Sequence, residues 1–414
     1  MKNSDRMGTP TLRMGSPIWL SGDPPQKYQT LRTPLTTEVA IVGGGITGAL
    51  VAEAFARAGV GVVLLERSLV GSGSTAASSA LLLREPDHNL SDLRRRYGPA
   101  ASERIWHLSQ RAVKSFVNRL RQLRIACDLV ERDAVHFATS RAAALALEQE
   151  LRYRRRAGFG GTALSSSAMR ELTAIPAYGA VRTTGHAQFD PCKACRGLIG
   201  AAAKAGAHIY ERSEVTRISP RRDGVRLHTK HAVADVKSVV IATGYATRRF
   251  RPLAGHFSLY RTYVLATSPL SLAQRRNIGL GDVMIWDTNR PYHYARWTQD
   301  HRLLMGGGDR RVAAGSRRAA FARATETLRQ DFETWLPGLS AVDIDAAWEG
   351  LFAVTPDSLP YIGPHRRYPS HLFALGYGGN GLTFGFLAAQ FLLEQWRGVK
   401  SADHTLFSFG RFGS

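Results

Sequence analysis

Hydrophobic residues make up 44% of this 414-residue chain and charged residues 21%, a balance typical of a folded globular protein with room for two lobes. No uncharged apolar stretch reaches the roughly 18 to 20 residues of a membrane span. Residues 1–8 lack the apolar core of a signal peptide, and three cysteines are too few for a disulfide framework. We therefore expect a cytoplasmic protein. The net charge of +22 permits nonspecific attraction to nucleic acid or anionic lipid.

A nucleotide-binding pattern follows residues 1–35, which are rich in proline and polar residues and which we expect to form a loose arm. An apolar strand is predicted first, then a glycine-rich turn, a helix and a second strand, at residues 37–42, 43–48, 46–57 and 61–66. The turn has the form GxGxxG, with Gly43, Gly45 and Gly48, and the second strand ends at Glu66.

Each part of this unit has a physical role. Gly43 permits the tight turn, Gly45 lets the backbone approach a pyrophosphate, and Gly48 allows the helix to pack closely on the strand. The helix N-terminus offers free N–H groups and a positive dipole end to phosphates. Glu66 is placed to accept a hydrogen bond from a ribose hydroxyl. Together these parts predict a dinucleotide site, and the alternative is an accidental glycine-rich turn.

The later chain alternates between helical and strand patterns. Helices are predicted over 99–125, 141–156, 191–206 and 315–335, the third of them opening on Asp190-Pro191, an N-cap followed by proline at the first helical position. Shorter strands are expected near 134–138, 209–210, 215–218, 225–228 and 239–241. Between Leu259 and Met305 the alternation of aromatic and small residues predicts an antiparallel sheet, with strands at 260–266, 283–287, 292–297 and 302–306.

Cys192 and Cys195 form a CxxC motif at the start of a predicted helix, where a thiol pKa can be lowered. We expect both to be packed in the cofactor lobe, and a regulatory dithiol is the alternative. Because Cys127 is the only other cysteine, a four-cysteine zinc site is excluded, and we predict no metal site.

The basic residues are spread in short runs along the chain rather than gathered in one segment, and no groove-reading motif accompanies them. We therefore predict a solvated basic surface and no specific nucleic-acid binding. Attraction to an acidic partner subunit or substrate is the alternative.

Four further segments, in order along the chain, extend the dinucleotide pattern: residues 67–80, 239–245, 348–363 and 376–384. The small-residue loop Arg67–Ala80, the strand and turn Val239–Tyr245, and the segments Trp348–Gly363 and Gly376–Phe384 resemble the D-amino-acid-oxidase-like (DAO) family of FAD-dependent oxidoreductases. Within it they resemble the gamma-glutamylputrescine oxidoreductase-like and glycine-sarcosine oxidase-like members.

The resemblance implies an α/β, two-lobed FAD-binding fold with a Rossmann-type dinucleotide-binding lobe and an antiparallel-sheet substrate lobe. The FAD-binding domain would comprise residues 36–90, 186–258 and 345–414. The substrate-binding domain, interleaved with it, would comprise residues 91–185 and 259–344.

The resemblance also implies where FAD would lie. The loop 376–383 and the following helix N-terminus would face the pyrimidine edge of the flavin, where N–H groups stabilise negative charge near N1, although a glycine-rich helix start without a ligand is the alternative. Val215 would lie beside the adenine. The implied FAD contacts are Gly43, Gly45, Ile46, Thr47, Gly48, Glu66, Arg67, Ser74, Thr75, Ser79, Val215, Thr243, Gly244, Gly363, Gly379, Asn380, Gly381, Leu382 and Thr383.

The sheet face toward the flavin would form the substrate cavity. The candidate lining residues are Tyr263, His293, Arg296, Tyr361 and Arg84. The tyrosines and the histidine could equally be packed core, and Arg296 could equally pair with an acid on the outer face.

Two departures from the family patterns bear on the class of substrate and on how the flavin is attached. Phe352 stands where members that oxidise free α-amino acids carry an arginine for the substrate carboxylate, and a phenylalanine cannot make that bidentate contact. An amine or N-substituted amino acid is therefore favoured as substrate. Asn380 and Thr383 stand where sarcosine-oxidase-like members have a His and a Lys, and no cysteine follows Cys195, so FAD is expected to be noncovalent unless a histidine carries it.

We thus expect an FAD-dependent oxidoreductase that oxidises a C–N bond by hydride transfer to flavin N5, after which the imine is hydrolysed. O2 or an electron carrier would be the acceptor. The alternatives are an amino-acid dehydrogenase subunit that needs a partner or carrier, and a flavin-binding protein without turnover.

Overall fold

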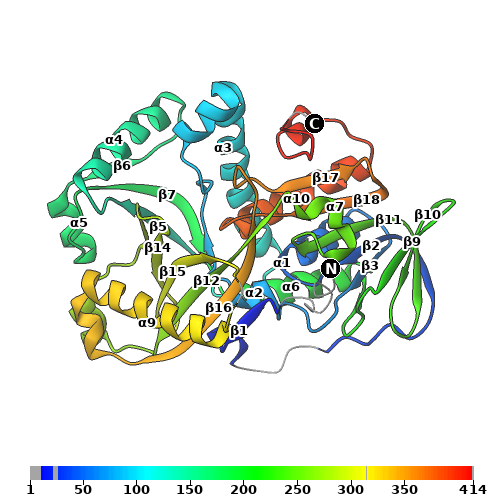
Figure 1. Cartoon of the computed structure of the whole chain (residues 1–414), viewed down its shortest axis with the longest axis horizontal. Helices are drawn as coiled ribbons and strands as arrows, with labels where there is room; N and C mark the ends of the chain where they lie inside the picture. Colours follow the sequence, from blue (N-terminus) through cyan, green and yellow to red (C-terminus); the bar gives the residue numbers. More distant parts are fainter. Residues whose placement is uncertain (1–10, 22–26, 314, 413–414) are drawn as a thin grey trace.

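The computed structural model describes residues 11–21, 27–313 and 315–412, which form two lobes, each built around one β-sheet (Figure 1). The chain passes between the two sheets several times, because strands that are distant in sequence are neighbours in each of them. The expected two-lobed α/β fold is therefore confirmed.

The first lobe, the cofactor lobe, is built on an eight-stranded sheet whose central strands are parallel. These strands are β18 (Tyr368–Leu375), β11 (Val233–Gly244), β2 (Leu35–Val42), β3 (Val62–Leu65) and β8 (His208–Tyr210), in that order. The antiparallel strands β17 (Tyr361–His365), β9 (Arg217–Arg221) and β10 (Gly224–His228) complete the sheet. The continuous apolar runs in β2 and β3 are those of strands buried on both faces.

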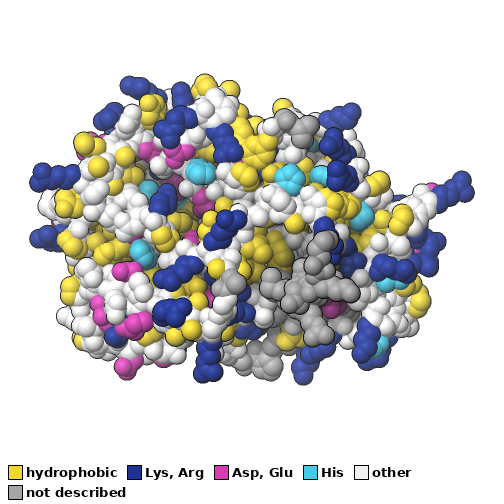
Figure 2. Space-filling model, viewed as in Figure 1, with side chains coloured by type: hydrophobic (Ala, Val, Ile, Leu, Met, Phe, Trp, Pro, Cys, Tyr) yellow, Lys and Arg dark blue, Asp and Glu magenta, His cyan; other side chains and the backbone are white. Residues whose placement is uncertain are grey.

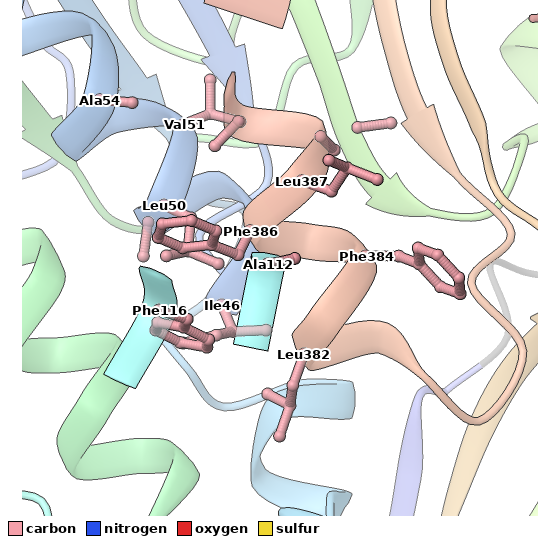
Figure 3. Packing of buried hydrophobic residues seen from close by; sticks show 14 of the residues in the cluster. Ile46, Leu50, Val51, Ala54, Ala112, Phe116, Leu382, Phe384, Phe386 and Leu387 are labelled. Atoms are coloured by element: carbon pink, nitrogen blue, oxygen red, sulfur yellow. The ribbon is translucent and has the colours of Figure 1, made fainter. Parts of the chain in front are cut away.

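Helices cover one face of this sheet and form its largest core. They are α1 (Ile46–Arg57), α6 (Pro191–Lys204), α10 (Gly381–Trp396) and α3 (Leu90–Gln122). Figure 3 shows α1, α3 and α10 meeting through Leu50, Phe116 and Phe386. The rings of Phe116 and Phe386 are stacked, with centroids 5.3 Å apart. This packing fixes the N-termini of α1 and α10 relative to each other.

The second lobe, the substrate lobe, is built on a ten-stranded, largely antiparallel sheet. Its path runs through β1 (Arg13–Gly15), β16 (Ile344–Val354), β12 (Ser258–Thr267), β15 (Leu303–Arg311), β14 (His293–Trp297), β13 (Met284–Asp287), β5 (Val130–Phe137), β7 (Ala180–Gln188) and β4 (Leu81–Leu82), and β6 (Thr162–Leu164) pairs with β7. Only the pairing of β13 with β5 is parallel among the described strands of this sheet.

Side chains alternate between the two faces of the substrate-lobe sheet. Leu265, Ile285 and Met305 point to one face and pack with residues of α9 (Arg317–Trp335), α8 (Leu272–Ile278) and η3 (Pro337–Ala341). The intervening residues, such as Thr262 and Tyr294, point to the opposite face and line a cavity. The sheet therefore has one face in a helical core and one face open to the cofactor lobe.

The expected loose arm at residues 1–35 is corrected where the structure describes it. Strand β1 pairs with β16, and Trp19 Nε1 donates to Ser78 O at 2.8 Å. Leu12 and Ile18 pack against apolar clusters of the sheet. A polar, proline-rich stretch is thus ordered by sheet pairing and a few apolar anchors; residues 1–10 and 22–26 lie outside the described residues.

The division between the lobes also differs from the expected one. Strands β4 and β16, expected in the FAD-binding domain, belong to the substrate-lobe sheet, whereas α3 packs in the core of the cofactor lobe. Helix α3 begins at Leu90, nine residues before the expected residue 99. The sequence pattern does not indicate a helix over residues 90–98, because the helix kinks at Gly98. The φ of 75° at Gly98 interrupts the helical conformation just before Pro99.

The other described helices are short or peripheral: η1 (Ile18–Leu20), α2 (Ser74–Ala77), α4 (Arg141–Arg156), α5 (Ser166–Thr173), η2 (Arg248–Phe250), α7 (Arg251–Ala254) and α11 (Ala402–Thr405). No helix within the described ranges is long and apolar enough to cross a membrane. On the face drawn in Figure 2, Lys and Arg side chains are distributed over both lobes.

Candidate active site

A cavity of about 1030 Å³ is lined by residues of both lobes. On the cofactor-lobe side, its wall comes from the turns that follow β2, β3 and β11, which are the carboxyl ends of parallel strands. On the substrate-lobe side, its wall comes from the inner face of β12, β14 and β16. Ligand-binding clefts form at such strand ends, so this cavity is the candidate active site.

The glycine-rich turn at one end of the cavity has the geometry that its sequence predicts. A Cβ atom on Gly48 would stand 1.9 Å from Gly43 O, so only glycine permits this contact between α1 and the turn. Gly43 itself has a φ of 112°. The Glu66 carboxylate lies at the end of β3, where it accepts the Gly44 N–H at 2.7 Å and the Ser68 N–H at 2.8 Å. The turn and the acid are thus held together as one rigid edge.

Most of the expected FAD contacts line this one cavity: Gly43, Gly45, Ile46, Thr47, Glu66, Arg67, Ser74, Thr75, Ser79, Val215, Thr243, Gly244, Gly379, Asn380, Gly381 and Leu382. Gly48 lies behind the wall in its packing role. Gly363 is corrected to a packing residue, because a Cβ there would stand 2.8 Å from the Gln395 side chain of α10. Thr383 is likewise outside the wall, and its hydroxyl donates to Leu83 O at 2.7 Å.

The start of α10 shows which N–H groups of the glycine-rich loop are free. Gly376 N donates to Gly244 O, Gly378 N to Ala353 O, and Gly379 N to the Asp87 carboxylate at 2.7 Å. The N–H groups of Gly381 and Leu382 lie in the first helical turn, which has no intrahelical acceptors for them. The positive end of α10 is therefore presented to the cavity by these two residues.

The N-terminal arm adds a cavity wall that the sequence did not indicate. Leu12 and Arg13 line the cavity, and Arg13 Nε donates to Ser72 O at 2.7 Å. A Cβ on Gly73 would stand 2.8 Å from the Leu12 side chain, so the arm lies directly on the small-residue loop after β3. The arm thus holds a guanidinium at the loop from which Ser74 and Thr75 line the cavity.

Two substrate candidates, Tyr263 and His293, lie on the wrong face of the sheet. Tyr263 is 2% exposed in the core under α9. His293 Nδ1 lies 3.1 Å from the Asp287 carboxylate and its Nε2 lies 3.3 Å from Asp331 of α9. Burial lowers the pKa of His293, but the hydrogen bond and charge of Asp287 outweigh it, so the pKa is raised. Both residues stabilise the sheet–helix interface.

The other three candidate substrate-site residues also have contacts that occupy their polar groups or rings. Arg296 is on the inner face but donates to the carbonyls of Ser79, Phe189 and Trp297, and burial lowers its pKa to about 9. The Tyr361 ring is stacked on Phe409 at 4.6 Å in the cofactor lobe. Arg84 does not line the cavity, and its guanidinium donates to Gly160 O and to Glu85, which does line it.

Sequence reasoning missed the polar residues that do line the substrate-lobe wall. They include Asp309 on β15, Thr262 on β12, Tyr294 on β14, Tyr292 just before β14, and Asp87 in the segment after β4. The alternation along β14 could have found Tyr292 and Tyr294, because they share a face with each other and not with His293. Phe352 of β16, predicted to replace an arginine, does line the cavity.

The two aspartates of this wall differ in how their charge is compensated. Asp87 accepts hydrogen bonds from Gly379 N and, at 2.8 Å, from Asn380 Nδ2. Asp309 Oδ1 is buried and has no hydrogen-bond partner among the described residues. Burial raises the pKa of Asp309 to about 6. Asp309 is therefore an acceptor in the cavity wall that is available to a ligand, whereas Asp87 is not.

The family model described as FAD dependent oxidoreductase (DAO) matches residues 38–395 of this chain. The chain belongs to the DAO family. Gamma-glutamylputrescine oxidoreductase of Escherichia coli (strain K12) is 27% identical over 380 residues, which is 90% of this chain and 86% of that protein. Glycine oxidase of Geobacillus kaustophilus (strain HTA426) is 27% identical over 360 residues, 83% of this chain and 89% of the other. The crystal structure of glycine oxidase from Geobacillus kaustophilus has a TM-score of 0.77 at 23% identity, covering 91% of this chain and 98% of that one.

This DAO-family protein is an FAD-dependent oxidoreductase, and its cavity fits the cofactor. The glycine-rich turn, the Glu66 carboxylate and the first-turn residues of α10 all line one continuous cavity, which suits the phosphates and ribose of a dinucleotide cofactor. Val215, in the segment after β8, lines the same cavity, and its position beside the adenine stays a prediction.

The cysteines do not form a redox or flavin-linking site. Cys192 Sγ lies 3.8 Å from Gly71 O and Cys195 Sγ lies 3.6 Å from Gly44 O, both buried beneath the cofactor loops. Burial raises the pKa of Cys192 to about 12 and also raises that of Cys195 well above its usual value. The thiols are therefore protonated packing groups, which disfavours the regulatory dithiol.

We predict that FAD is bound noncovalently. Among the described residues that line the cavity there is no cysteine, and their one histidine, His136, lies on β5 of the substrate lobe. Precipitation of the purified protein with acid should release all of the flavin into the supernatant, as measured by absorbance. A precipitate that stays yellow after washing would contradict this expectation.

We predict that Arg13→Ala weakens FAD binding about tenfold, because it removes a charged hydrogen-bond donor from the cavity wall and loosens the arm from Ser72. Fluorescence titration of the apoprotein with FAD measures the dissociation constant. Arg32→Ala, an exposed arginine of the same N-terminal region, is the control and should bind FAD like the unaltered protein. An equal dissociation constant for Arg13→Ala would show that the arm does not contribute to cofactor binding.

Proposed function

We propose that this protein oxidises a C–N bond of an amine or N-substituted amino acid. The observation that carries the proposal is Asp309, a cavity-lining carboxylate with an unpartnered buried oxygen among the described residues. A buried acceptor without a donor costs free energy. An ammonium group supplies both the missing donor and the opposite charge, so the cavity favours a cationic nitrogen.

Asp309 also has the acidity that the reaction needs. An alkylammonium must lose a proton before the C–H bond beside nitrogen can leave as hydride, because the nitrogen lone pair has to stabilise the developing positive charge. A carboxyl whose pKa is raised to about 6 by burial is a better proton acceptor than an ordinary aspartate. We infer that Asp309 binds the ammonium and then takes its proton.

The chain's other residues position the reacting groups. FAD, when bound, accepts the hydride and so takes up both electrons of the C–H bond. The first-turn N–H groups of Gly381 and Leu382 face the cavity and favour negative charge at its cofactor end. Burial raises the pKa of Tyr294 to about 12, so its hydroxyl stays neutral beside Asp309 and can orient the substrate. Water then hydrolyses the imine product.

Phe352 separates this proposal from oxidation of simple α-amino acids. Its side chain is part of the cavity wall, 6.0 Å from the Tyr260 ring centre to centre. A phenyl ring offers no donor to a carboxylate, and a buried carboxylate without a partner is costly. Glycine oxidase, a relative, is named for an amino-acid substrate, whereas gamma-glutamylputrescine oxidoreductase is named for a substituted amine. The cavity wall of this chain favours the second class.

The electron acceptor is either O2 or a carrier or partner subunit. The basic surface in Figure 2 supports an acidic carrier or partner as the alternative to O2. A flavin-binding protein without turnover is the remaining candidate. The unpartnered oxygen of Asp309 argues against it, because a protein without a substrate would gain nothing from the free-energy cost of burying that oxygen.

Steady-state turnover with a panel of amines, N-methyl amino acids and α-amino acids tests the proposal. We expect amines to give a carbonyl product and a released nitrogen compound in equal amounts, either with O2 consumption or only with an artificial acceptor. Oxygen uptake with and without that acceptor separates an oxidase from a dehydrogenase. Efficient turnover of simple α-amino acids and not of amines would contradict the substrate class.

A further inference from the structure

A second group of polar residues lines the same cavity on the substrate-lobe side. We call it the distal subsite: Glu85 after β4, Asn89 at the start of α3, His136 on β5 and Arg154 on α4. Figure 1 shows α4, β5 and β7 on the side of the sheet that is remote from the cofactor-lobe strands. Two of its members, His136 and Arg154, thus come from elements of the substrate lobe and not from the glycine-rich turn.

Glu85 carries a buried oxygen that lacks a donor. The residue is 5% exposed, and its Oε2 has no hydrogen-bond partner in the part of the chain that the structure describes. His186 Nδ1 lies 3.4 Å from Oε2, but this nitrogen accepts the Arg84 N–H at 3.2 Å and so has no proton to give. Because Nδ1 accepts, His186 Nε2 donates to the Thr183 hydroxyl at 2.8 Å, and that hydroxyl can donate in turn to Glu85. A carboxylate has about four acceptor positions, so Glu85 keeps acceptor capacity for a ligand.

His136 carries a second unpartnered acceptor. It is also 5% exposed, and its Nε2 lacks a partner among the same described residues. Burial lowers the pKa of His136 to about 3, so the ring is neutral, and the Asp287 backbone holds its other nitrogen. The ring is stacked on Trp286 with centroids 5.1 Å apart, which fixes its orientation. Nε2 is therefore a hydrogen-bond acceptor held in place.

The cations near these acceptors are already engaged. Arg154 Nε donates to Glu150 at 2.8 Å, and its guanidinium lies 4.6 Å from the centre of the Trp106 ring. The closest approach of Arg154 to Glu85 is 4.0 Å, longer than a hydrogen bond. Arg84 Nε donates to Glu85 Oε1 at 3.3 Å, whereas Glu85 Oε2 and His136 Nε2, both from residues that line the cavity, have no hydrogen-bond partner among the described residues.

We propose that the distal subsite binds a second nitrogen of the substrate, a primary ammonium that donates to Glu85 and His136. This inference rests on the proposed function, in which Asp309 binds the nitrogen that is oxidised. A molecule with two amino groups joined by an apolar chain would satisfy the unpartnered acceptors at both places. The preferred substrate class is therefore a diamine rather than a monoamine.

The test compares kcat/KM for straight-chain diamines of increasing length with kcat/KM for monoamines of the same length. In the unaltered protein, the best diamine should exceed its matched monoamine about 100-fold, the effect of one buried charged hydrogen-bonded pair. The ratio of diamine to monoamine kcat/KM should fall to near unity in Glu85→Gln. In His136→Phe, which keeps the stacked ring, the same ratio should decrease about tenfold. Glu148→Gln, on the exposed side of α4, is the control and should keep the ratio. Because each ratio is measured within one protein, partial loss of FAD or folding cancels.

Other outcomes of the same experiment separate failure of the distal subsite from failure of the proposed function. Equal kcat/KM values for diamines and monoamines in the unaltered protein would overturn the distal subsite and leave the proposed function intact. A preference for ω-amino acids over diamines would mean that Arg154 selects an anion, which also overturns the inference. If no nitrogen compound is oxidised, the proposed function itself fails.

Discussion

Gly48→Ala should yield a folded but colourless protein whose affinity for FAD falls about 100-fold. The added Cβ would stand 1.9 Å from Gly43 O, which is backbone and cannot rotate away. Relieving the clash must separate α1 from the turn, at a cost of roughly 1 to 3 kcal/mol, and every 1.4 kcal/mol is a tenfold change in binding. The measurement is the flavin-to-protein absorbance ratio after purification, followed by titration of the apoprotein with FAD.

The control for this prediction is a helical glycine with free space around it. Gly200→Ala, in α6 of the same lobe, would place its Cβ with no described heavy atom within 4 Å. This variant should be as yellow as the unaltered protein and no less stable, because alanine favours a helix over glycine. If Gly48→Ala also retains full flavin, the close packing at Gly48 does not determine cofactor binding.

Asp309→Asn should lower kcat/KM for the best amine by about 100-fold or more while the protein keeps its FAD. Loss of one partner from a buried charge pair typically costs roughly 2 to 5 kcal/mol, and Asp309 lies in the substrate-lobe wall rather than at the glycine-rich turn. Asp223→Asn, exposed in the turn between β9 and β10, is the control and should leave kcat/KM unchanged. Unaltered kcat/KM in Asp309→Asn would remove this residue from the substrate site.

The pH dependence gives an independent check on Asp309. Its pKa is raised to about 6 by burial, so the carboxylate fraction rises as pH increases through that value. Because the ammonium binds to the carboxylate form, kcat/KM should rise with pH through about 6 in the unaltered protein. In Asp309→Asn this inflection should be absent. A profile of the same shape in both proteins would assign the inflection to another group.

The cofactor lobe could be predicted from the sequence because its signals are local. The apolar run of β2, the three glycines and the acid at the end of β3 are neighbours in the chain, and each has one geometric role. Helix α1 begins and ends where the pattern predicts. The FAD contacts implied by resemblance came from similarly short segments, and only Gly363, Thr383 and the packing residue Gly48 lie off the cavity wall.

The substrate wall could not be predicted from the sequence in the same way. A side chain on a strand points to one of two faces, and the sequence of β14 does not state which face meets the cofactor lobe. The predicted site residue His293 therefore points to the face that packs against helices, whereas its neighbours Tyr292 and Tyr294 point to the cavity. The meeting of Asp87 with Gly379, almost three hundred residues later, depends on tertiary packing that no local pattern encodes.

The ordering of the N-terminal arm shows the same limit. Its composition is that of a flexible segment, yet β1 completes an edge of the substrate-lobe sheet and Arg13 reaches the cavity. The partner strand β16 lies more than three hundred residues away, so the pairing follows from the fold and not from the arm's own propensity.

Anaerobic addition of amines to the purified yellow protein tests the central claim most directly, because it needs neither an electron acceptor nor a product assay. We predict loss of the oxidised-flavin absorbance with amines, and with diamines at the lowest concentrations, but not with simple α-amino acids. Loss of absorbance with α-amino acids alone would mean that another cation replaces the arginine absent at Phe352 and would contradict the amine assignment. A flavin that no nitrogen compound reduces would contradict C–N oxidation altogether.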